Sequence, residues 1–172
     1  KHGFKPAPVY GSQLQTAALP AAKPEADLIV EWTPVKETLA DGTVVELRKP
    51  VYRIENPNYG PLPEDLLVSP RVAPQMIGMG LLEAIPIEDL QALQDTDDAD
   101  GNGISGKLNQ VWDLATEQTV PGRFGWKAAE PDVHQQSMGA FAGDMGLTST
   151  LKPKTDCMPE QNCEWFTHGG EP

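Results

Sequence analysis

One short segment of this chain has the residue types and the spacing of a cation-binding loop. Asp98, Asp100 and Asn102 place oxygen side chains at the first, third and fifth positions of a run whose sixth residue is Gly103. A calcium loop needs this pattern, because the turn wraps alternate oxygens around an ion at about 2.3–2.6 Å. The next expected ligand is the backbone carbonyl of Ile104. The segment therefore predicts a structural calcium site.

The match to a calcium loop is incomplete, so an alternative stays open. Position twelve is Asn109, where an EF-hand has a bidentate Glu. The missing ligands would have to come from nearby carboxylates, for which Asp95, Asp97 and Asp113 are the candidates. The alternative interpretation is an acidic, glycine-rich surface turn that binds no ion. A redox-inert ion on such a loop would hold the backbone in place and would take no part in a reaction.

A second set of residues indicates a cofactor. His134, Met138, Phe141 and Met145 recur at helical spacing and would form one stripe along a helix. Such a stripe can face a haem, with His134 or a methionine as an axial ligand or a distal group. The same pattern is also typical of a helix that packs its Met and Phe side chains into a core, and this second interpretation is the more frequent one.

The cysteines leave two redox states open. Cys157 and Cys163 are the only cysteines, with five residues between them. This spacing fits one small disulfide loop in an oxidising compartment, which we favour, or two free thiols. Neither cysteine belongs to a C-x-x-C-H motif. The chain also lacks a G-x-S-x-G nucleophile elbow, a G-x-x-x-x-G-K-[ST] loop and a G-x-G-x-x-G that follows a strand.

Composition and charge narrow the class of protein. The chain has 172 residues, enough for one domain with a core, and roughly 47% of them are apolar, as in ordinary globular proteins. Its 16 glycines and 17 prolines predict long irregular stretches. The net charge is −12, and residues 72–106 hold seven carboxylates without a Lys or Arg. This distribution attracts cations or basic partners and disfavours nucleic-acid binding, and no apolar run reaches the roughly 18 residues of a membrane span.

Short elements would have to position these residues, and their mixture predicts an α+β fold. β-Branched residues alternate with charged ones on both sides of Asp41-Gly42, a dipeptide that tolerates the backbone of a tight turn. We therefore expect a β-hairpin with strands over 27–38 and 43–54. We treat the chain as a single region with four parts: an extended arm over 1–26, the hairpin over 27–56, helices and the acidic loop over 57–150, and an irregular tail over 151–172.

Three short helices are predicted from the residues at their ends. They cover 71–84 after Ser69 and Pro70, the stretch from Pro86 to Gln94, and the stretch from Asp132 to about Gly143. In the third helix the carboxylate of Asp132 can cap the N-terminus. Gln135 lies three residues further on, so we expect its side chain to reach back and complete a capping box.

Several blocks of sequence make the chain resemble a known family. The four main blocks are RVAPQMIGMGLLEAIP (71–86), DDADGNGISGKLNQVWD (97–113), GRFGWKA (122–128) and DMGLTS (144–149). PVYGSQLQ (8–15), VELRKPVY (45–52) and the cysteine pair fit in the same order. With these blocks the chain resembles the bacterial di-haem oxidoreductases, a family also described as thiol oxidoreductases and related to di-haem cytochrome c peroxidases.

The resemblance implies which part of a di-haem protein this chain corresponds to. The family attaches c-type haems through C-x-x-C-H, which is missing here. The chain therefore looks like the central part of a cytochrome c peroxidase-like di-haem protein, in which haem c is attached by flanking segments of the full-length parent and not by this chain. Related peroxidases carry a structural calcium near their haems, which strengthens the calcium interpretation. The implied partners are those flanking segments and a small redox donor protein.

The resemblance transfers no catalytic residue directly. We expect Glu83 and His134 to be polar groups that face a cofactor or peroxide pocket, and Met138 and Met145 to contact the cofactor. For Glu83 the alternative is a solvated helix position or a group that supports a bound calcium. Because the chain begins at Lys1 without a signal-peptide pattern, we expect a mature or excised product.

Two hypotheses about function follow. In the first, this is the central scaffold of a periplasmic or secreted c-type di-haem oxidoreductase with peroxidase-like electron transfer, and the chain is inactive by itself. In the second, it is a free-standing calcium-stabilised binding module whose acidic face docks a basic partner. The two hypotheses differ in whether the chain can fold cooperatively without other polypeptide.

Overall fold

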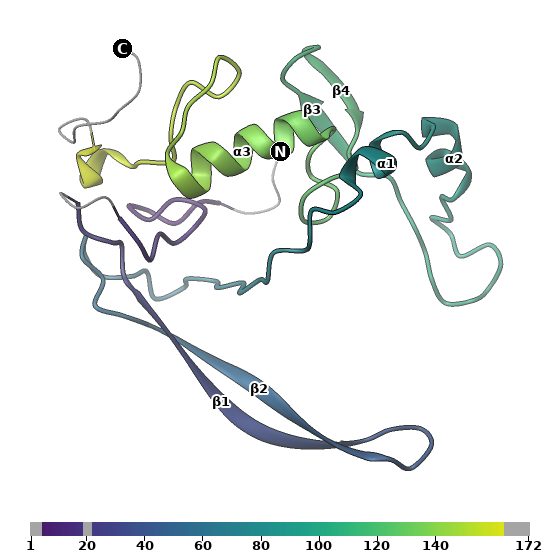
Figure 1. Cartoon of the computed structure of the whole chain (residues 1–172), viewed down its shortest axis with the longest axis horizontal. Helices are drawn as coiled ribbons and strands as arrows, with labels where there is room; N and C mark the ends of the chain where they lie inside the picture. Colours follow the sequence, from purple (N-terminus) through teal and green to yellow (C-terminus); the bar gives the residue numbers. More distant parts are fainter. Residues whose placement is uncertain (1–4, 19–21, 164–172) are drawn as a thin grey trace. The chain divides into compact units, whose positions relative to one another are not determined.

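The structure is a computed structural model, which describes residues 5–18 and 22–163 (Figure 1). The chain divides into two compact units, the first formed by Lys1–Val72 with Asp156–Pro172 and the second by Ala73–Thr155. The first residues of the predicted arm and the end of the predicted tail lie outside the described residues. Two small antiparallel hairpins and three short α-helices make up the described part, so the predicted α+β class is confirmed.

The first unit contains a long β-hairpin. Strand β1 (Asp27–Thr38) pairs antiparallel with strand β2 (Val44–Glu55) over the full length of both. Between them Gly42 has φ +85°, a conformation that glycine adopts without steric cost. The Asp41 carboxylate accepts a hydrogen bond from the Thr43 backbone N–H at 2.9 Å, and hydrogen bonding to Thr43 lowers the pKa of Asp41. The predicted hairpin and its turn are therefore confirmed.

The two faces of this hairpin differ. One face carries the cross-strand pairs Leu28 with Ile54, Val30 with Tyr52, and Trp32 with Pro50. On the other face, Arg53 forms a bidentate pair with Glu31 at 2.7 and 2.8 Å. An isolated two-stranded hairpin is marginally stable, so its apolar face needs a cover. Residues Tyr52 and Ile54 line a groove of about 420 Å³ together with Leu62, Pro63, Leu66, Val68 and Pro70.

The second unit holds the remaining regular elements. In chain order these are α1 (Met79–Glu83), α2 (Ile87–Ala92), β3 (Gln110–Asp113), β4 (Gln118–Pro121) and α3 (Val133–Met145). Helix α2 follows Pro86 as predicted. The helix predicted over 71–84 is wrong for most of its length, since only α1 forms there. Gly78 lies at φ +81° and Pro74 lacks a backbone N–H, so a helix can begin only after Gly78.

A second hairpin, formed by β3 and β4, was not predicted. Its turn is held by Asp113, whose carboxylate accepts hydrogen bonds from the Ala115 N–H at 2.8 Å and from the Thr116 hydroxyl at 2.7 Å. These bonds lower the pKa of Asp113, with the Thr116 hydroxyl as the largest cause. An aspartate that accepts from the backbone N–H two residues on is a known turn pattern, so Asp113 could have been used to find this hairpin.

Acid is expected to loosen this turn. The pKa of Asp113 is lower in the folded than in the unfolded chain, so ionised Asp113 favours the turn above the unfolded pKa of about 4. The contribution is lost as the pH falls through the lowered value. Amide exchange of Ala115 and Thr116, corrected for its intrinsic pH dependence, should therefore show less protection at about pH 2 than at about pH 6.

The variant Asp113→Asn is the control for this pH effect. Its side-chain oxygen can still accept hydrogen bonds but does not titrate, so the protection of both amides should not change with pH. A wild-type turn that keeps the same protection at both pH values would contradict the assignment.

Helix α3 begins where its sequence predicts, with one difference in its N-terminal capping, and ends at Met145, two residues beyond the expected end near Gly143. The Asp132 carboxylate accepts a hydrogen bond from the Gln135 backbone N–H at 2.6 Å, and Gly146 caps the C-terminus with φ +68°. The Gln135 side chain does not reach back to Asp132. Its amide nitrogen donates to the Trp112 carbonyl at 3.0 Å, and its oxygen accepts from the Leu114 N–H at 2.8 Å. Gln135 thereby joins α3 to β3, and only half of the predicted capping box is present.

The hydrophobic core is small. Among the described residues the buried hydrophobic side chains are Tyr10 and Ala26 in the first unit, and Phe124, Met138 and Ala142 in the second. The chain exposes 13581 Å². Two globular domains, each with half of this mass, would together expose only about 9,900 Å². The chain therefore buries less surface than two compact domains of this mass would. No helix in the described ranges is long and apolar enough to cross a bilayer.

Candidate functional site

The acidic loop, residues 95–106, is closed at its base by backbone pairing. Asp95 and Gly106 form an isolated antiparallel bridge, with N–H to carbonyl distances of 3.0 and 2.9 Å in the two directions. The loop leaves the end of α2, and Figure 1 draws it in teal as a segment that extends from the helix. Because the bridge fixes both ends, the carboxylates at the start of the loop and along it are held on one closed turn.

Side chains inside the acidic loop bond to its own backbone. Both carboxylate oxygens of Asp98 accept from the Gly103 N–H at 3.1 Å. The Asp100 carboxylate accepts from the backbone and side-chain nitrogens of Asn102 at 3.1 and 2.7 Å. The Asn102 oxygen in turn accepts from the Ile104 N–H at 2.7 Å. The positions that the sequence predicted as ligands are therefore ordered by local hydrogen bonds.

Three carboxylates of this loop lie close enough to share one cation. Asp95, Asp98 and Asp100 each offer an oxygen, and these oxygens lie within 4.8 Å of one another. Oxygen donors of this kind suit Ca²⁺ or Mg²⁺, and a cation would also relieve the repulsion among three like charges. Of the three carboxylates considered as additional ligands, the structure brings Asp95 into the cluster. Asp97 is not in it, and Asp113 is engaged in the β3–β4 turn.

Glu83 connects two helices of the second unit. Its carboxylate accepts a hydrogen bond at 3.0 Å from the Val133 N–H, in the first turn of α3. An acidic group there satisfies a free N–H and interacts well with the helix dipole. The structure thus gives Glu83 a contact with α3, whereas its predicted place at a cofactor or peroxide pocket stays a prediction.

Arg123 is a positioning residue that sequence reasoning missed. Its guanidinium donates to the carbonyls of Leu82 at 3.3 Å, Glu83 at 3.0 Å and Ile85 at 2.6 Å. Leu82 and Glu83 lie at the C-terminal end of α1, and Ile85 lies two residues beyond it. Carbonyls at the end of a helix lack their usual partners further along the helix. A five-residue helix needs such help. Arg123 lies in the family block GRFGWKA, which was the available indication of its importance.

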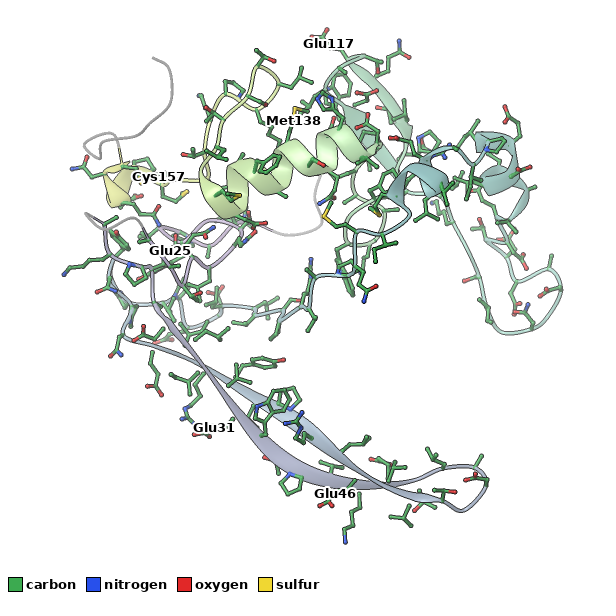
Figure 2. All side chains as sticks on the ribbon, in the orientation of Figure 1. Glu25, Glu31, Glu46, Glu117, Met138 and Cys157 are labelled. Carbon is green, nitrogen blue, oxygen red and sulfur yellow. A yellow bond between two sulfur atoms is a disulfide. The ribbon has the colours of Figure 1, made fainter. Side chains whose placement is uncertain are left out.

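The predicted stripe on α3 is only partly exposed. Met138, labelled in Figure 2, is buried, and its sulfur accepts a hydrogen bond from the Ser149 hydroxyl at 3.3 Å. His134 is exposed near the N-terminus of α3, and Met145 is 64% exposed at its last residue. The helix therefore packs at Met138 and leaves His134 and Met145 open to solvent or to another segment. The predicted haem contacts of these residues remain predictions.

The cysteines do not fit covalent haem attachment within this chain. Cys157 and Cys163 form a disulfide, so the favoured redox state is confirmed (Figure 2). They are the only cysteines of the chain, and a c-type haem needs two thioether sulfurs beside a histidine. With both sulfurs joined to each other, no sulfur is left for a thioether.

The described residues form an α+β region with a small core, a closed acidic loop and helices held by side-chain contacts. A comparison with protein families matches residues 15–161 to the family described as "Di-haem oxidoreductase, putative peroxidase". The chain therefore belongs to the di-haem oxidoreductase family, as the sequence blocks indicated. Searches of curated proteins and of solved structures each return no match.

Proposed function

We propose that this region is the central scaffold of a c-type di-haem oxidoreductase with peroxidase-like electron transfer. The observation that carries this proposal is the small core together with the apolar side chains left open around α1. Ile77 is 85% and Leu81 is 79% exposed, and Met76 and Leu82 are also more than half exposed. Exposed apolar side chains that cluster in this way are a common feature of interaction sites. In our proposal it is covered by the flanking haem-binding segments of the same polypeptide.

In this proposal the flanking segments carry the redox chemistry, and this chain supports the polypeptide around it. Haem iron, when bound by the flanking segments, supplies the redox step. The residues of this chain hold the surrounding polypeptide and exclude water. Arg123 and Glu83 fix α1 and α3 in the second unit, so that the open apolar side chains of α1 are presented in one arrangement. His134 and Met145 are the exposed α3 residues that we place toward a cofactor.

We further propose that the acidic loop binds a structural calcium ion. Carboxylate oxygens of Asp95, Asp98 and Asp100 would hold it, with Asn102 and the Ile104 carbonyl as the remaining candidates. The ion would stiffen the loop and would not react. We also place the protein in the periplasm or outside the cell, which the disulfide supports, because such bonds persist in oxidising compartments. A small redox donor protein is the proposed external partner.

Thermal unfolding of the chain alone tests the scaffold proposal. The isolated chain should unfold in a broad transition and bind a hydrophobic dye, since its core is too small for cooperative folding. Calcium should slow amide exchange within residues 95–106 without making the transition sharp. Circular dichroism, dye fluorescence and hydrogen exchange, each with calcium or a chelator, provide the measurements.

The same experiment separates the second candidate function, a calcium-stabilised binding module with an acidic docking face. The cluster of Asp95, Asp98 and Asp100 is the observation that favours it. A sharp, cooperative transition whose midpoint rises with calcium would support the module and overturn the scaffold. The double variant Asp98→Asn with Asp100→Asn should lose the calcium effect, whereas Asp97→Asn, outside the cluster, should keep it.

A further inference from the structure

The acidic loop contains a pair of residues that can react with each other. Asn102 is the only asparagine of the chain that is followed by a glycine. In such a pair the backbone nitrogen of the glycine can attack the side-chain carbonyl carbon of the asparagine, because glycine has no Cβ to block the approach. Both Asn102 and Gly103 are exposed, so water reaches them. The reaction is deamidation, which converts asparagine to aspartate or isoaspartate.

Deamidation of this pair would take two steps. In the first, the Gly103 nitrogen loses its proton and bonds to Cγ of Asn102, the bond from Cγ to Nδ2 breaks, and Nδ2 leaves with that proton as ammonia. A five-membered succinimide ring results. In the second step, one water molecule opens the ring at either of its two carbonyls. Because the first step needs a deprotonated Gly103 nitrogen, the surroundings of this N–H control the rate.

A negative charge lies directly against this N–H. Both carboxylate oxygens of Asp98 accept from the Gly103 N–H at 3.1 Å. Loss of the proton would leave an anionic nitrogen beside an anionic carboxylate, which Coulomb repulsion disfavours. A carboxylate is also too weak a base to remove the proton from a backbone amide. Asp98 therefore stabilises the protonated, unreactive form of the Gly103 nitrogen.

The Asn102 side chain is fixed at both ends. Its Nδ2 donates to the Asp100 carboxylate at 2.7 Å, and its Oδ1 accepts from the Ile104 N–H at 2.7 Å. The bond from Ile104 polarises the carbonyl and would stabilise negative charge on Oδ1 during attack. The carbonyl carbon is thus activated, whereas the attacking nitrogen is not. The rate then depends on the contact between Asp98 and Gly103.

We propose that Asn102 and Gly103 form a deamidation site, and that the Asp98 carboxylate slows the reaction as long as the acidic loop is closed. Opening of the loop separates Asp98 from the Gly103 N–H and allows the reaction. The product has a new carboxylate at position 102, and in the isoaspartate form the backbone also gains a methylene group. The new charge adds to the cluster of Asp95, Asp98 and Asp100, so deamidation changes the charge of the loop permanently.

Incubation of the 172-residue chain at neutral pH with a chelator, followed by peptide mapping with mass spectrometry, tests this proposal. The readout is the rate at which aspartate and isoaspartate form at position 102. Asp98→Asn keeps an acceptor oxygen next to Gly103 but removes the charge, so position 102 should react about tenfold faster than in the wild type. Asp97→Asn removes the same charge from a residue outside this hydrogen bond, and this matched control should react like the wild type.

Guanidinium chloride provides the second measurement, because it opens the loop in every variant and screens the charges. In the denaturant all three chains should react at one rate, which should exceed the rate of the folded wild type. Equal rates for Asp98→Asn and the wild type in buffer would overturn the role of the charge. A slower reaction in Asp98→Asn would make Asp98 a general base, the opposite of the proposal. A folded wild type that reacts as fast as the denatured chain would show that the closed loop gives no protection.

Discussion

Replacing Gly122 with alanine is expected to disrupt the structure around β3 and β4. An added Cβ would lie 2.0 Å from the Ala128 carbonyl oxygen, 2.9 Å from its carbonyl carbon and 3.0 Å from a Val111 methyl group. Two of these atoms are backbone and cannot swing away. Relief requires moving the segment that carries Ala128, which the Asn109 side chain holds in place. We expect a loss of about 3 kcal/mol in local stability.

Hydrogen exchange is the measurement for Gly122→Ala. The Gly122 amide donates to the Asn109 carbonyl, and the strand amides of β3 and β4 are paired with each other. Their exchange should accelerate about a hundredfold or more. Gly139→Ala is the matched control: no atom lies within 4 Å of its added Cβ, and it sits inside α3, where alanine favours the helix by about 1 kcal/mol. Unchanged amide exchange in Gly122→Ala would contradict the close approach of the Ala128 carbonyl to Gly122.

The sequence predicts those elements whose signals, such as alternation, turn residues and caps, all lie within a few residues of one another. The first hairpin combines alternating residues with Asp41-Gly42, and both features act within a few residues of the turn. The start of α3 depends on Asp132, and its capping contact spans three residues. By contrast, β3 and β4 have four residues each, too few to show a period. Gly78 and Pro74 do indicate where α1 begins, whereas Ser69 and Pro70 predict a start that is too early.

The candidate site was only partly predictable, because its geometry depends on contacts between distant residues. Asp98 and Asp100 follow from spacing alone. The choice of Asp95 over Asp97 depends on the backbone bridge to Gly106, eleven positions away, which no side-chain pattern encodes. The Arg123 contacts with the α1 carbonyls span about forty residues. Sequence patterns thus identify ligand types, whereas tertiary contacts decide which of them meet.

The surface of the chain explains why several predicted cofactor residues stay open. A helix stripe is interpretable only when the surface that it faces is present. On α3, Met138 meets Ser149 within the unit, but Phe141 and Met145 are half exposed or more. The same holds for Leu81 on α1. These apolar side chains are exposed to solvent in the chain by itself. The scaffold proposal accounts for that exposure, because it places other segments of the polypeptide over them.

The variant Gln161→Ala is expected to release the disulfide loop from the rest of the first unit. Gln161 lies inside the loop that Cys157 and Cys163 close, and its side chain is buried. Its amide nitrogen donates to the Glu25 carboxylate and, at 3.3 Å, to the Val9 carbonyl, and its oxygen accepts from the Met158 N–H at 2.9 Å. One side chain therefore joins the loop to two segments near the N-terminal end.

The loss of stability in Gln161→Ala comes mainly from the Glu25 carboxylate, which loses one of its hydrogen-bond donors. Glu25 is only 4% exposed, and without Gln161 its carboxylate keeps the Gln15 N–H, at 2.7 Å, as a partner. Leaving a buried charged group short of a hydrogen bond costs about 3 kcal/mol. Amide exchange at Gln15, Glu25 and Met158 should accelerate about a hundredfold. Glu160→Ala changes an exposed neighbour of Gln161 in the short 3-10 helix η1 (Pro159–Gln161), and it should leave these rates unchanged.

A double-mutant cycle decides whether Glu25 is the reason for this effect. If the stranded carboxylate dominates, Glu25→Gln combined with Gln161→Ala should be less damaging than Gln161→Ala alone, because the buried group is then neutral. Purely additive effects would mean that the contacts with Val9 and Met158 hold the loop, and that the buried pair contributes little. In that case the anchor is Gln161 itself, so the Met158 amide should stay protected when the disulfide between Cys157 and Cys163 is reduced. Loss of that protection on reduction would instead place the anchor in the covalent loop.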